Sequence, residues 1–497
     1  MRLAELCHNL PITLRAGSPD TSIGGLVEDS RRAGAGDLFI ARQGTVADGR
    51  RFMGEAVAAG AVAVLTDRSV DAAPAGAAHL TCEDVPLCAA MLAERFHGEA
   101  SGKLALIGIT GTNGKTTIAY LAHQLLNRSG IRCGLIGTVQ VDHGEGLEKA
   151  TLTTPPAVEI SRLLARMVRR GCQACVMETS SHALDQQRTA GLHFTGGVFT
   201  NLSGDHLDYH GTMEAYAQAK VRLFKAIDPT GWAVINIDDP AAEQMIGACA
   251  GRIITSSLID EGATCWARAG ALAMDATEAE FAGPWGAFML RLPLVGRHNV
   301  ANALQAAAVG HQLGLNGDAL LDGLSQCSAP PGRLEPVTGP LDEYIVLVDY
   351  AHTDDALDNV LGALRPTVPA GGRLRVVFGC GGDRDVSKRP RMADAAWRWA
   401  DEVIITSDNP RTEDPQRIID DIAAGIPAER IDRTLCLVDR EQAIEAAIDR
   451  ARPGDIILIA GKGHEDYQII GSTRRPFDDR AAAAQALVRC RSRVAAT

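Results

Sequence analysis

Short apolar runs alternate with segments of helical periodicity along most of this chain. In its middle part the apolar runs lie at residues 104–109, 132–137, 173–177, 197–200 and 232–237. Further apolar runs follow at residues 344–349, 374–379, 402–406 and 455–460. This alternation is typical of a mostly parallel sheet with helices on both faces. We therefore predict an α/β protein that contains two large units of this kind.

The start of the chain has a weaker pattern. It holds two short strand-like runs, 37–41 and 61–66, with alanine-rich helical stretches between them. A Pro- and Gly-rich break at 329–332 separates the two large units. We predict three domains: a small α/β domain at residues 1–100, a central domain with a mostly parallel sheet at 101–330, and a Rossmann-like domain at 331–497. The tail after Phe477 is predicted to be helical.

Composition and charge limit the classes of function. The chain has 497 residues and a formal net charge of −12, which argues against nucleic acid as a partner, because its phosphates need a basic face. An acidic protein can still bind small anions at locally positive sites. The N-terminus lacks the basic region followed by an apolar region that a signal peptide has, and no apolar run approaches the length of a membrane span. We expect a cytoplasmic protein without nucleic-acid or membrane partners.

The 12 cysteines are scattered without the spacing of a metal site. The single C-x-x-C pair, Cys172 and Cys175, lies in an apolar strand-like run. Buried free thiols in a reducing compartment are therefore the favoured interpretation.

The most informative segment is Ile109-Thr-Gly-Thr-Asn-Gly-Lys-Thr-Thr117. It joins an apolar strand-like run to a predicted helix over 118–126. A glycine-rich turn in this position can close backbone N–H groups around phosphate, Lys115 can reach the terminal phosphates, and the Thr116 hydroxyl can contact Mg²⁺. The loop is shorter than the usual pattern, because Ile109 stands where that pattern has glycine. We predict nucleotide binding; a plain glycine turn is the alternative.

Polar stretches follow five other predicted strands. In parallel sheets, ligands collect beyond the carboxyl ends of the strands, so these stretches predict two facing sites on two domains. They are Glu178-Thr-Ser-Ser-His182, Asn201-Leu-Ser-Gly-Asp-His-Leu-Asp-Tyr-His210, Cys380-Gly-Gly-Asp-Arg384, Ser407-Asp-Asn-Pro-Arg411 and Gly461-Lys-Gly-His-Glu465.

Some of these side chains have a chemistry that suits particular ligands. Glu178 and His206 are donors for Mg²⁺, and the alternative is that each is an ordinary hydrogen-bonded loop residue. Arg384 and Arg411 offer planar forks for carboxylate or phosphate, and the alternative is a structural salt bridge. Glu465 could hold an ammonium group. The two arginines with the glutamate predict a pocket for a zwitterion that carries an extra carboxylate.

With these motifs the chain resembles the Mur ligases, which build the peptide of bacterial cell-wall precursors. Thr110-Gly-Thr-Asn-Gly-Lys-Thr116 is similar to the phosphate loop of that family, and the resemblance covers essentially the whole chain. Three further segments resemble its nucleotide-binding elements in the same order: His298-Asn-Val-Ala-Asn302, Gly332-Arg333 and Asp349-Tyr-Ala-His352. The resemblance implies an ATP-dependent, ADP-forming ligase of peptidoglycan biosynthesis, a process that serves cell shape and division.

Asp408-Asn-Pro-Arg411 is similar to the motif with which one subgroup of that family recognises meso-diaminopimelate, and lysine-adding relatives lack this arginine. The resemblance therefore implies that diaminopimelate is joined, through an acyl phosphate, to the D-glutamate γ-carboxylate of UDP-N-acetylmuramoyl-L-alanyl-D-glutamate. It implies ATP as a substrate and Mg²⁺ as a cofactor. We expect a monomer.

The resemblance also implies roles for residues at matching positions. Residues implied for ATP are Gly111, Thr112, Asn113, Gly114, Lys115, Thr116, Thr117, Asn299, Arg333 and Asp349. Residues implied for the UDP-sugar dipeptide are Ser30, Thr45, Thr153, Thr154, Ser180, Gln186 and Arg188. Residues implied for diaminopimelate are Arg384, Asp408, Asn409, Pro410, Arg411, Gly461 and Glu465.

The metal ligands implied are Thr116, Glu178, His206 and Lys220, the last as a carbamylated side chain. Lys115, Lys220 and His206 are the residues implied for catalysis, with His206 as a ligand rather than a general base. From the sequence alone, Lys220 would be interpreted as a solvated lysine on a helix.

Three alternatives stay open. The first is a ligase for another amino acid, such as a relative of folylpolyglutamate synthase or of the later dipeptide-adding enzyme. The second is a non-catalytic, nucleotide-dependent switch that binds a sugar nucleotide, and the third is a sugar or nucleoside kinase. Because the substrates are expected on different domains, we also predict that the third domain rotates about a hinge near 329–332.

Overall fold

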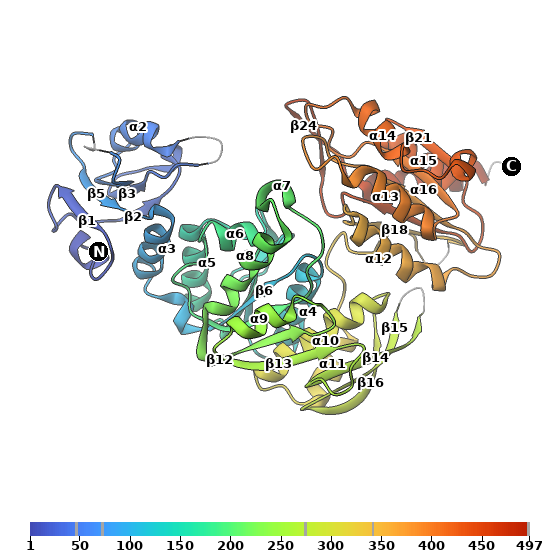
Figure 1. The fold of residues 1–497 in the computed structure, drawn as a ribbon, viewed down its shortest axis with the longest axis horizontal. Helices are drawn as coiled ribbons and strands as arrows, with labels where there is room; N and C mark the ends of the chain where they lie inside the picture. The colour runs from blue at the N-terminus through green and yellow to red at the C-terminus, as the bar shows by residue number, and fades with distance from the viewer. Residues whose placement is uncertain (45–47, 71–73, 273–275, 340–341, 495–497) are drawn as a thin grey trace.

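The computed structural model of the protein describes residues 1–44, 48–70, 74–272, 276–339 and 342–494, so the predicted site residue Thr45 lies outside the described residues. Figure 1 shows three bodies, with the blue N-terminal part, the green and yellow middle and the orange C-terminal part following one another. Each of the three predicted regions forms its own main sheet. Within the described residues, no helix combines the length and apolar character needed to cross a membrane.

The N-terminal sheet has five strands in the order β1-β5-β4-β3-β2. Only β1 runs antiparallel to its neighbour. The strands are β1 (Thr13–Ala16), β2 (Gly25–Val27), β3 (Asp37–Ile40), β4 (Ala63–Asp67) and β5 (Ala78–Cys82). The helices are α1 (Leu3–Leu6), α2 (Met53–Ala58) and α3 (Val85–Phe96). The two strands predicted near 37–41 and 61–66 are thereby confirmed.

The central sheet has 11 strands in the order β16-β15-β14-β13-β12-β11-β6-β10-β7-β8-β9. Strands β14 to β7 of that order pair in parallel, and antiparallel strands extend both edges. The strands are β6 (Ala105–Thr110), β7 (Cys133–Ile136), β8 (Gln140–Asp142), β9 (Leu147–Lys149), β10 (Ala174–Glu178), β11 (Phe194–Phe199), β12 (Ile227–Asn236), β13 (Arg252–Ser257), β14 (Cys265–Leu272), β15 (Thr277–Gly283) and β16 (Gly286–Leu292).

Helices cover both faces of this sheet. One apolar core lies between the sheet and α4 (Lys115–Arg128), α10 (Arg297–Gln312) and α11 (Gly317–Ser325). The other face is covered by α5 (Ala157–Arg169), α6 (Ser181–Asp185), α8 (Met213–Lys225) and α9 (Ala242–Ala248). The short helix α7 (Leu207–His210) stands out from the body toward the C-terminal domain (Figure 1).

The C-terminal sheet has six strands in the order β17-β18-β22-β19-β20-β21, and all pairs except β17-β18 are parallel. The strands are β17 (Glu335–Pro336), β18 (Ile345–Asp349), β19 (Leu374–Phe378), β20 (Glu402–Thr406), β21 (Thr434–Leu437) and β22 (Ile456–Ala460), with a separate hairpin of β23 (Tyr467–Ile470) and β24 (Thr473–Pro476). The helices are α12 (Asp354–Leu364), α13 (Lys388–Trp399), α14 (Pro415–Ala423), α15 (Arg440–Asp449) and α16 (Asp479–Val494).

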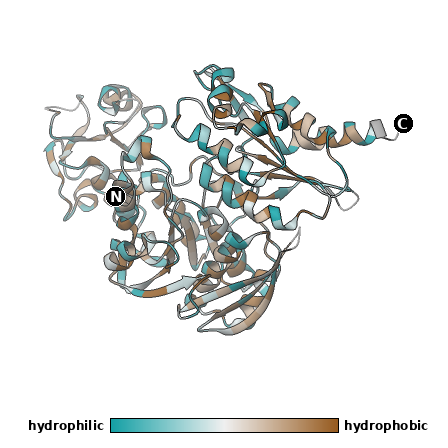
Figure 2. Cartoon of the chain, turned by 45° about the vertical axis from the view of Figure 1, so that its right-hand side comes forward, coloured by the Kyte–Doolittle hydropathy of each residue, from teal (hydrophilic) through white to brown (hydrophobic). Residues whose placement is uncertain are grey.

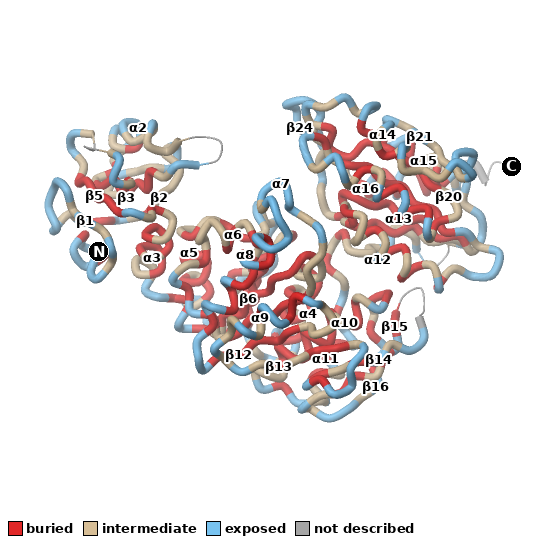
Figure 3. The backbone as a smooth tube through the Cα atoms, viewed as in Figure 1, coloured by how far each residue is buried: buried red, intermediate tan, exposed pale blue. Residues whose placement is uncertain are grey.

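Burial follows the apolar runs of the sequence. In Figure 2 the brown, apolar positions concentrate on the strands inside each body, while the helices carry teal on their outer sides. Figure 3 shows the same strands buried, whereas α7 and β24 are exposed. Strands β10, β19 and β22 are buried along their whole length because helices cover both of their faces.

The predicted α/β fold is confirmed, including the terminal helix. Cys172 and Cys175 are buried free thiols, as predicted, although β10 begins only at Ala174. The sequence did not predict the antiparallel extension β14-β15-β16. Its outer strand β16 is buried at only two of seven positions.

Candidate active site

The glycine-rich loop joins the end of β6 to the start of α4, as predicted. Lys115 Nζ folds back onto the loop and donates to the carbonyl oxygens of Gly111 and Thr112, each at 2.7 Å. These carbonyls satisfy the ammonium group while keeping it at the mouth of the loop. Burial lowers the pKa of Lys115 from its ordinary value.

Two positions in the loop require glycine. Gly111 has φ +147°, and a Cβ there would lie 1.8 Å from Thr200 Oγ1. Gly114 has φ +87°, and a Cβ there would lie 2.5 Å from Asn302 Oδ1. The backbone of the loop is therefore held tightly against β11 and α10.

Glu178 ends β10 beside this loop, and its side chain is only 1% exposed. Its Oε2 accepts hydrogen bonds from Thr116 Oγ1 at 2.8 Å and Thr138 Oγ1 at 2.9 Å, and its Oε1 accepts one from Thr138 N at 2.7 Å. Within the described part of the chain it forms no ion pair. A buried carboxylate held only by neutral donors is suited to a cation.

His206 lies at the start of α7 with φ 56°. Its Nε2 is 3.4 Å from Asp205 Oδ2, and its ring meets the ring of His182 edge-on. Desolvation lowers the pKa of His206 to about 4, which keeps its ring neutral at pH 7. A neutral imidazole is the form that ligates metal ions.

Lys220 is not a solvated residue, so the interpretation from sequence alone was wrong. It lies on the inner face of α8 and is 1% exposed, with Nζ 4.1 Å from the centre of the Tyr216 ring. Nζ has no hydrogen bond or ion pair within the described residues. Burial, with Lys115 as a second cause, lowers the pKa of Lys220 well below its ordinary value.

The predicted nucleotide residues beyond the loop gather where three segments meet: α10, the linker at residues 326–334 between α11 and β17, and β18. Asn299 Nδ2 donates to Val295 O at 2.8 Å, and its Oδ1 accepts from Asn302 at 3.1 Å. Asp349 accepts from the backbone of Leu334 and Ala351, both at 2.8 Å, and burial raises its pKa. Asp349 therefore also has a structural function, because it fastens the linker to β18.

Three cavities contain most of the predicted residues. A cavity of about 170 Å³, here called the phosphate-loop cavity, is lined by residues 111–116 together with Thr153, Glu178, Ser180, His206 and Lys220. A cavity of about 460 Å³, the α10 cavity, is lined by Asn113, Gly114, Thr117, Asn299, Arg333 and Asp349. The two cavities share Asn113, Gly114 and Arg333 in their walls and are therefore neighbours.

A cavity of about 390 Å³, the arginine cavity, belongs mainly to the C-terminal domain. It is lined by Arg384, Asp408, Asn409, Arg411, Gly461 and Glu465. Asp205, His206, Tyr350 and His352 line both this cavity and the phosphate-loop cavity. These shared residues mark the place where groups bound in the two cavities could meet.

The two predicted arginines differ in their surroundings. Arg411 has φ 51°, and its backbone pairs with the hairpin through Ile469 O at 3.1 Å and Gly471 N at 2.7 Å. Its guanidinium donates to Gly382 O at 2.7 Å. Arg384 is exposed at the cavity wall. Pairing with the hairpin therefore fixes the direction of Arg411, whereas Arg384 keeps more freedom.

The predicted sugar-nucleotide residues are only partly brought together. Thr154 Oγ1 donates to Glu178 O at 2.7 Å and receives a bond from Ser180 N at 3.0 Å. Arg188 donates to Thr154 O and Gln186 Oε1, both at 2.7 Å. Ser30 lies apart in the N-terminal domain, where its hydroxyl donates to Glu55 at 3.4 Å.

Several residues of the site were missed from the sequence. Asp355, on α12, accepts from Asn113 Nδ2 at 2.7 Å and Ser203 Oγ at 2.9 Å, and so joins the C-terminal domain to the loop. Asp205 and Lys462 were also missed, although both lie inside motifs that had been singled out. A larger cavity of about 920 Å³ beside the linker contains only Asn299 and Arg333 of the predicted residues.

Among the described residues, no group of three or more His, Cys, Asp or Glu side chains is arranged to hold a metal ion. The predicted metal ligands include only two residues of these types, Glu178 and His206. The remaining ligands would be the Thr116 hydroxyl, substrate oxygens and a modified Lys220.

Comparison with known proteins gives matches along the chain. The Mur ligase middle domain matches residues 109–310, the glutamate ligase domain of Mur ligases matches 332–463, and the catalytic domain of the Mur ligase family matches 22–97.

Individual relatives match nearly the full length. The chain is 47% identical over 475 residues to the UDP-N-acetylmuramoyl-L-alanyl-D-glutamate–2,6-diaminopimelate ligase of Synechococcus elongatus, covering 94% of each chain. It is 45% identical over 480 residues to the protein of that name from Pseudomonas aeruginosa, covering 94% of this chain and 96% of the relative. A solved structure of a ligase with this name is 36% identical, has a TM-score of 0.69, and covers 98% of this chain and 99% of its own. The chain therefore belongs to the Mur ligase family.

Proposed function

We propose that this protein is an ATP-dependent ligase that joins meso-2,6-diaminopimelate to the D-glutamate γ-carboxylate of UDP-N-acetylmuramoyl-L-alanyl-D-glutamate. The products are the UDP-muramoyl tripeptide, ADP and phosphate. The observation that carries the proposal is the contact between two cavities of different chemistry. The phosphate-loop cavity suits a nucleotide, the arginine cavity suits a zwitterion, and Asp205, His206, Tyr350 and His352 line both.

The reaction needs activation because a carboxylate is a poor electrophile. A γ-carboxylate oxygen attacks the γ-phosphorus of ATP, and ADP leaves with the electron pair of the broken P–O bond. The amine of diaminopimelate then attacks the acyl carbon, and the tetrahedral intermediate expels phosphate as the nitrogen loses a proton. The protein has to align these groups and stabilise the negative charge, so no side chain is required as a nucleophile.

Lys115 is proposed to stabilise the transferring phosphoryl group. Its ammonium group rests on the carbonyls of Gly111 and Thr112, so a bound phosphate can take over these two hydrogen bonds without a large movement. The first turn of α4 adds backbone N–H groups that have no partner within the helix and can bind the same phosphate. Asn299, Arg333 and Asp349 would hold the remaining part of the nucleotide in the α10 cavity.

The residues present fit Mg²⁺. Glu178 is a buried carboxylate that forms no ion pair with any residue the structure describes, and the Thr116 hydroxyl is 2.8 Å from its Oε2. When bound there with His206, the ion would neutralise charge on the phosphates.

Lys220 is proposed to become carbamylated. A neutral amine adds to carbon dioxide with loss of one proton, and burial favours the neutral amine at Nζ. The resulting anion would supply a further metal ligand on the wall of the phosphate-loop cavity. Isotopically labelled bicarbonate should give a carbamate signal in the wild type but not in Lys220→Ala. Equal signals in both would contradict this role, and Lys225→Ala, an exposed lysine of the same helix, is the control.

The arginine cavity is proposed to select the amino acid. Diaminopimelate has a second carboxylate next to its remote amine. Arg411 and Arg384 would pair with that carboxylate, while Asp408, Asn409 and Glu465 would face the ammonium group.

The UDP-sugar dipeptide would bind on the other side of Glu178. The residues proposed to bind it there are Thr153, Thr154, Ser180, Gln186 and Arg188, and Ser30 would contribute from the N-terminal domain. We infer a cytoplasmic monomer that acts in peptidoglycan biosynthesis.

Incubation with all three substrates tests the proposal. We expect phosphate release and a product whose mass equals the sugar nucleotide plus diaminopimelate less one water. Omission of any one substrate should abolish this product. ATP hydrolysis or phosphorylation without a new amide would contradict the proposal and favour a switch or a kinase.

A further inference from the structure

Lys462 is a buried cation in the loop that follows β22, behind three residues that line the arginine cavity: Asp408, Asn409 and Glu465. Its side chain is 0% exposed. Nζ donates to Asp408 Oδ1, Asn409 Oδ1 and Glu465 Oε2, each at 3.2 Å. An ammonium group has three hydrogens, so these three acceptors use its full capacity. Because Lys462 is buried and each of its donors has an acceptor, it differs from a solvated surface lysine.

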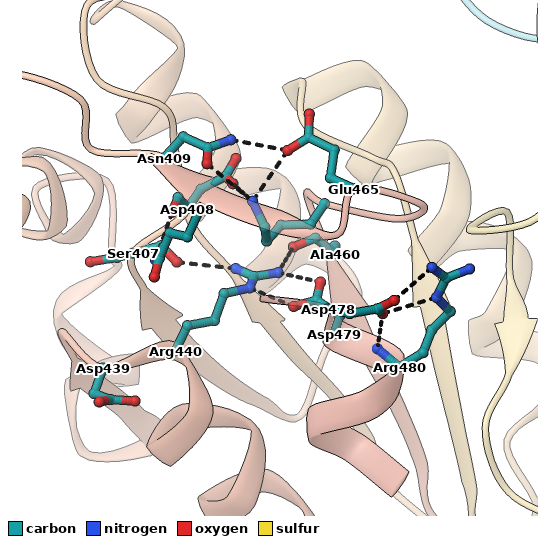
Figure 4. A network of polar contacts seen from close by, with 12 residues as sticks. Ser407, Asp408, Asn409, Asp439, Arg440, Ala460, Glu465, Asp478, Asp479 and Arg480 are labelled. Carbon is teal, nitrogen blue, oxygen red and sulfur yellow. Dashed lines mark hydrogen bonds and ion pairs between the residues drawn. The ribbon is translucent and has the colours of Figure 1, made fainter. Parts of the chain in front are cut away.

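The three acceptors are the residues proposed to face the ammonium group of the substrate. Asn409 Nδ2 donates to Glu465 Oε2 at 3.0 Å, and its Oδ1 also accepts from Ile469 N at 2.9 Å. These bonds determine which way the Asn409 amide is turned. Figure 4 shows Glu465 with one oxygen in this network and the other directed away from it. Lys462 thus fixes the orientation of the polar side chains at this end of the cavity.

Lys462 also sets the charge of this end. Asp408 and Glu465 carry two negative charges, and Lys462 removes one of them. The neighbouring Arg440 adds none to the balance, because it is paired with Asp479 at 2.7 and 2.8 Å (Figure 4). Burial raises the pKa of the Asp408 carboxyl, but the charges of Lys462 and Arg440 outweigh this and hold it below its ordinary value. One net negative charge remains for a substrate ammonium group.

We propose that Lys462 is a positioning residue for the amino-acid substrate, which holds Asp408, Asn409 and Glu465 in the arrangement and net charge that accept one ammonium group beside a carboxylate. The inference rests on the proposed function. Without Lys462, two carboxylates would lie in a buried place with no cation between them. They would move apart or take up a proton, and in either case the ammonium site would be lost.

Lys462→Met tests this role, because Met has a similar length and no charge. We expect the KM for meso-diaminopimelate to rise by about a hundredfold, since removing one partner of a buried ion pair leaves the other charges uncompensated. The KM for ATP and the kcat at saturating amino acid should change by less than about threefold, because the network does not touch the phosphate loop. A rise confined to the KM for diaminopimelate would identify a positioning role.

Lys462→Arg keeps the charge but cannot direct three donors in the geometry of an ammonium group. We expect an intermediate KM for diaminopimelate, about tenfold above wild type. If Lys462→Met fails to fold, the KM of the Lys462→Arg variant for diaminopimelate tests the positioning role instead. A folded Lys462→Arg protein with the wild-type KM would overturn the proposal.

Arg375→Met is the matched control. Arg375 is 1% exposed in the same domain, and its Nε donates to Glu402 at 2.8 Å while its Nη1 pairs with Asp455. It lies at the start of β19, whereas Lys462 follows the end of the parallel neighbour β22, so the two cations are at opposite ends of the sheet. Arg375→Met should lower Tm as Lys462→Met does, but leave the KM for diaminopimelate unchanged.

The outcomes separate this inference from the proposed function. A wild-type protein that forms no amide with diaminopimelate would overturn both. A wild-type protein that forms the amide, with a Lys462→Met variant whose KM stays within about threefold, would overturn only the role of Lys462. In that case Lys462 would contribute to stability alone, as Arg375 does.

Discussion

The phosphate loop and the arginine cavity use opposite means of recognition. The loop is nine consecutive residues, and its shape depends on backbone groups and on two glycines with positive φ. The arginine cavity is built mainly from side chains of three loops that follow β19, β20 and β22, and the buried Lys462 holds three of these side chains from behind. A site formed by backbone groups can lie within one segment of the sequence. A site formed by charged side chains from several loops is assembled only when the sheet brings those loops together.

This difference has a chemical reason. Phosphate is common to all nucleotide sites, and oriented N–H groups can bind it with little information about the rest of the ligand. Selection of one amino acid needs paired charges at set distances. Substitutions in the two regions should therefore affect different kinetic constants, and the following variants test that separation.

Lys115→Ala should have the largest effect. Removal of the cation that is proposed to face the phosphates should lower kcat by about a thousandfold, because preorganised charge stabilises the transition state. Initial rates of phosphate release measure this, with Lys225→Ala as the control. A variant with wild-type kcat would show that the loop does not act on the transferring phosphoryl group.

Arg411→Ala should raise the KM for diaminopimelate by about a hundredfold, because the substrate carboxylate loses its partner in a partly buried place. The KM for ATP should barely change. Arg411→Lys keeps a charge without the planar fork and should lie between wild type and Arg411→Ala. An equal rise in the KM for ATP would contradict the separation of the two regions.

Gly114→Ala should raise the KM for ATP by about tenfold. The new Cβ would lie 2.5 Å from Asn302 Oδ1 at φ +87°. Gly130→Ala is a close control, because Gly130 has φ +83° and a Cβ there would meet nothing within 4 Å. Both variants should lose about 1–2 kcal/mol of stability from the left-handed backbone. If both change the KM for ATP equally, backbone strain rather than the shape of the loop is the cause.

Asp355→Ala should have the smallest effect of the four. It removes the hydrogen bonds from Asn113 and Ser203 that join the C-terminal domain to the loop, each worth about 0.5–1.5 kcal/mol. We expect the KM for ATP to rise by about fivefold, and small-angle scattering to show less compaction when ATP and sugar nucleotide are added. Asp358→Ala removes interactions with Trp399 and Arg398 within the C-terminal domain and should change neither quantity.

Features with a local signal could be predicted from the sequence, whereas features assembled by the fold from distant segments could not. Most of the parallel strands and the loop at 109–117 were predicted because their signals are local runs of apolar residues and glycines, whereas β2, β5, β13, β14 and β21 were not among the predicted strands. Lys220 was misjudged because a lysine on a helix gives no local sign of burial. Asp355 follows Thr353 at the start of α12, where an acidic residue is ordinary for a helix N-terminus, so its bond to the loop had no signal. Lys462 was overlooked because two of its three partners, Asp408 and Asn409, lie in another loop that only the fold brings close to it.

The most direct test of the whole account compares meso-diaminopimelate with L-lysine as the amino-acid substrate. Lysine has the remote amine but lacks the second carboxylate that Arg384 and Arg411 are proposed to bind. We predict kcat/KM for diaminopimelate to exceed that for lysine by at least about a hundredfold, measured as phosphate release with confirmation of the amide product by mass. Equal values for the two amino acids would contradict selection by the arginine cavity, even if the ligase activity itself were present.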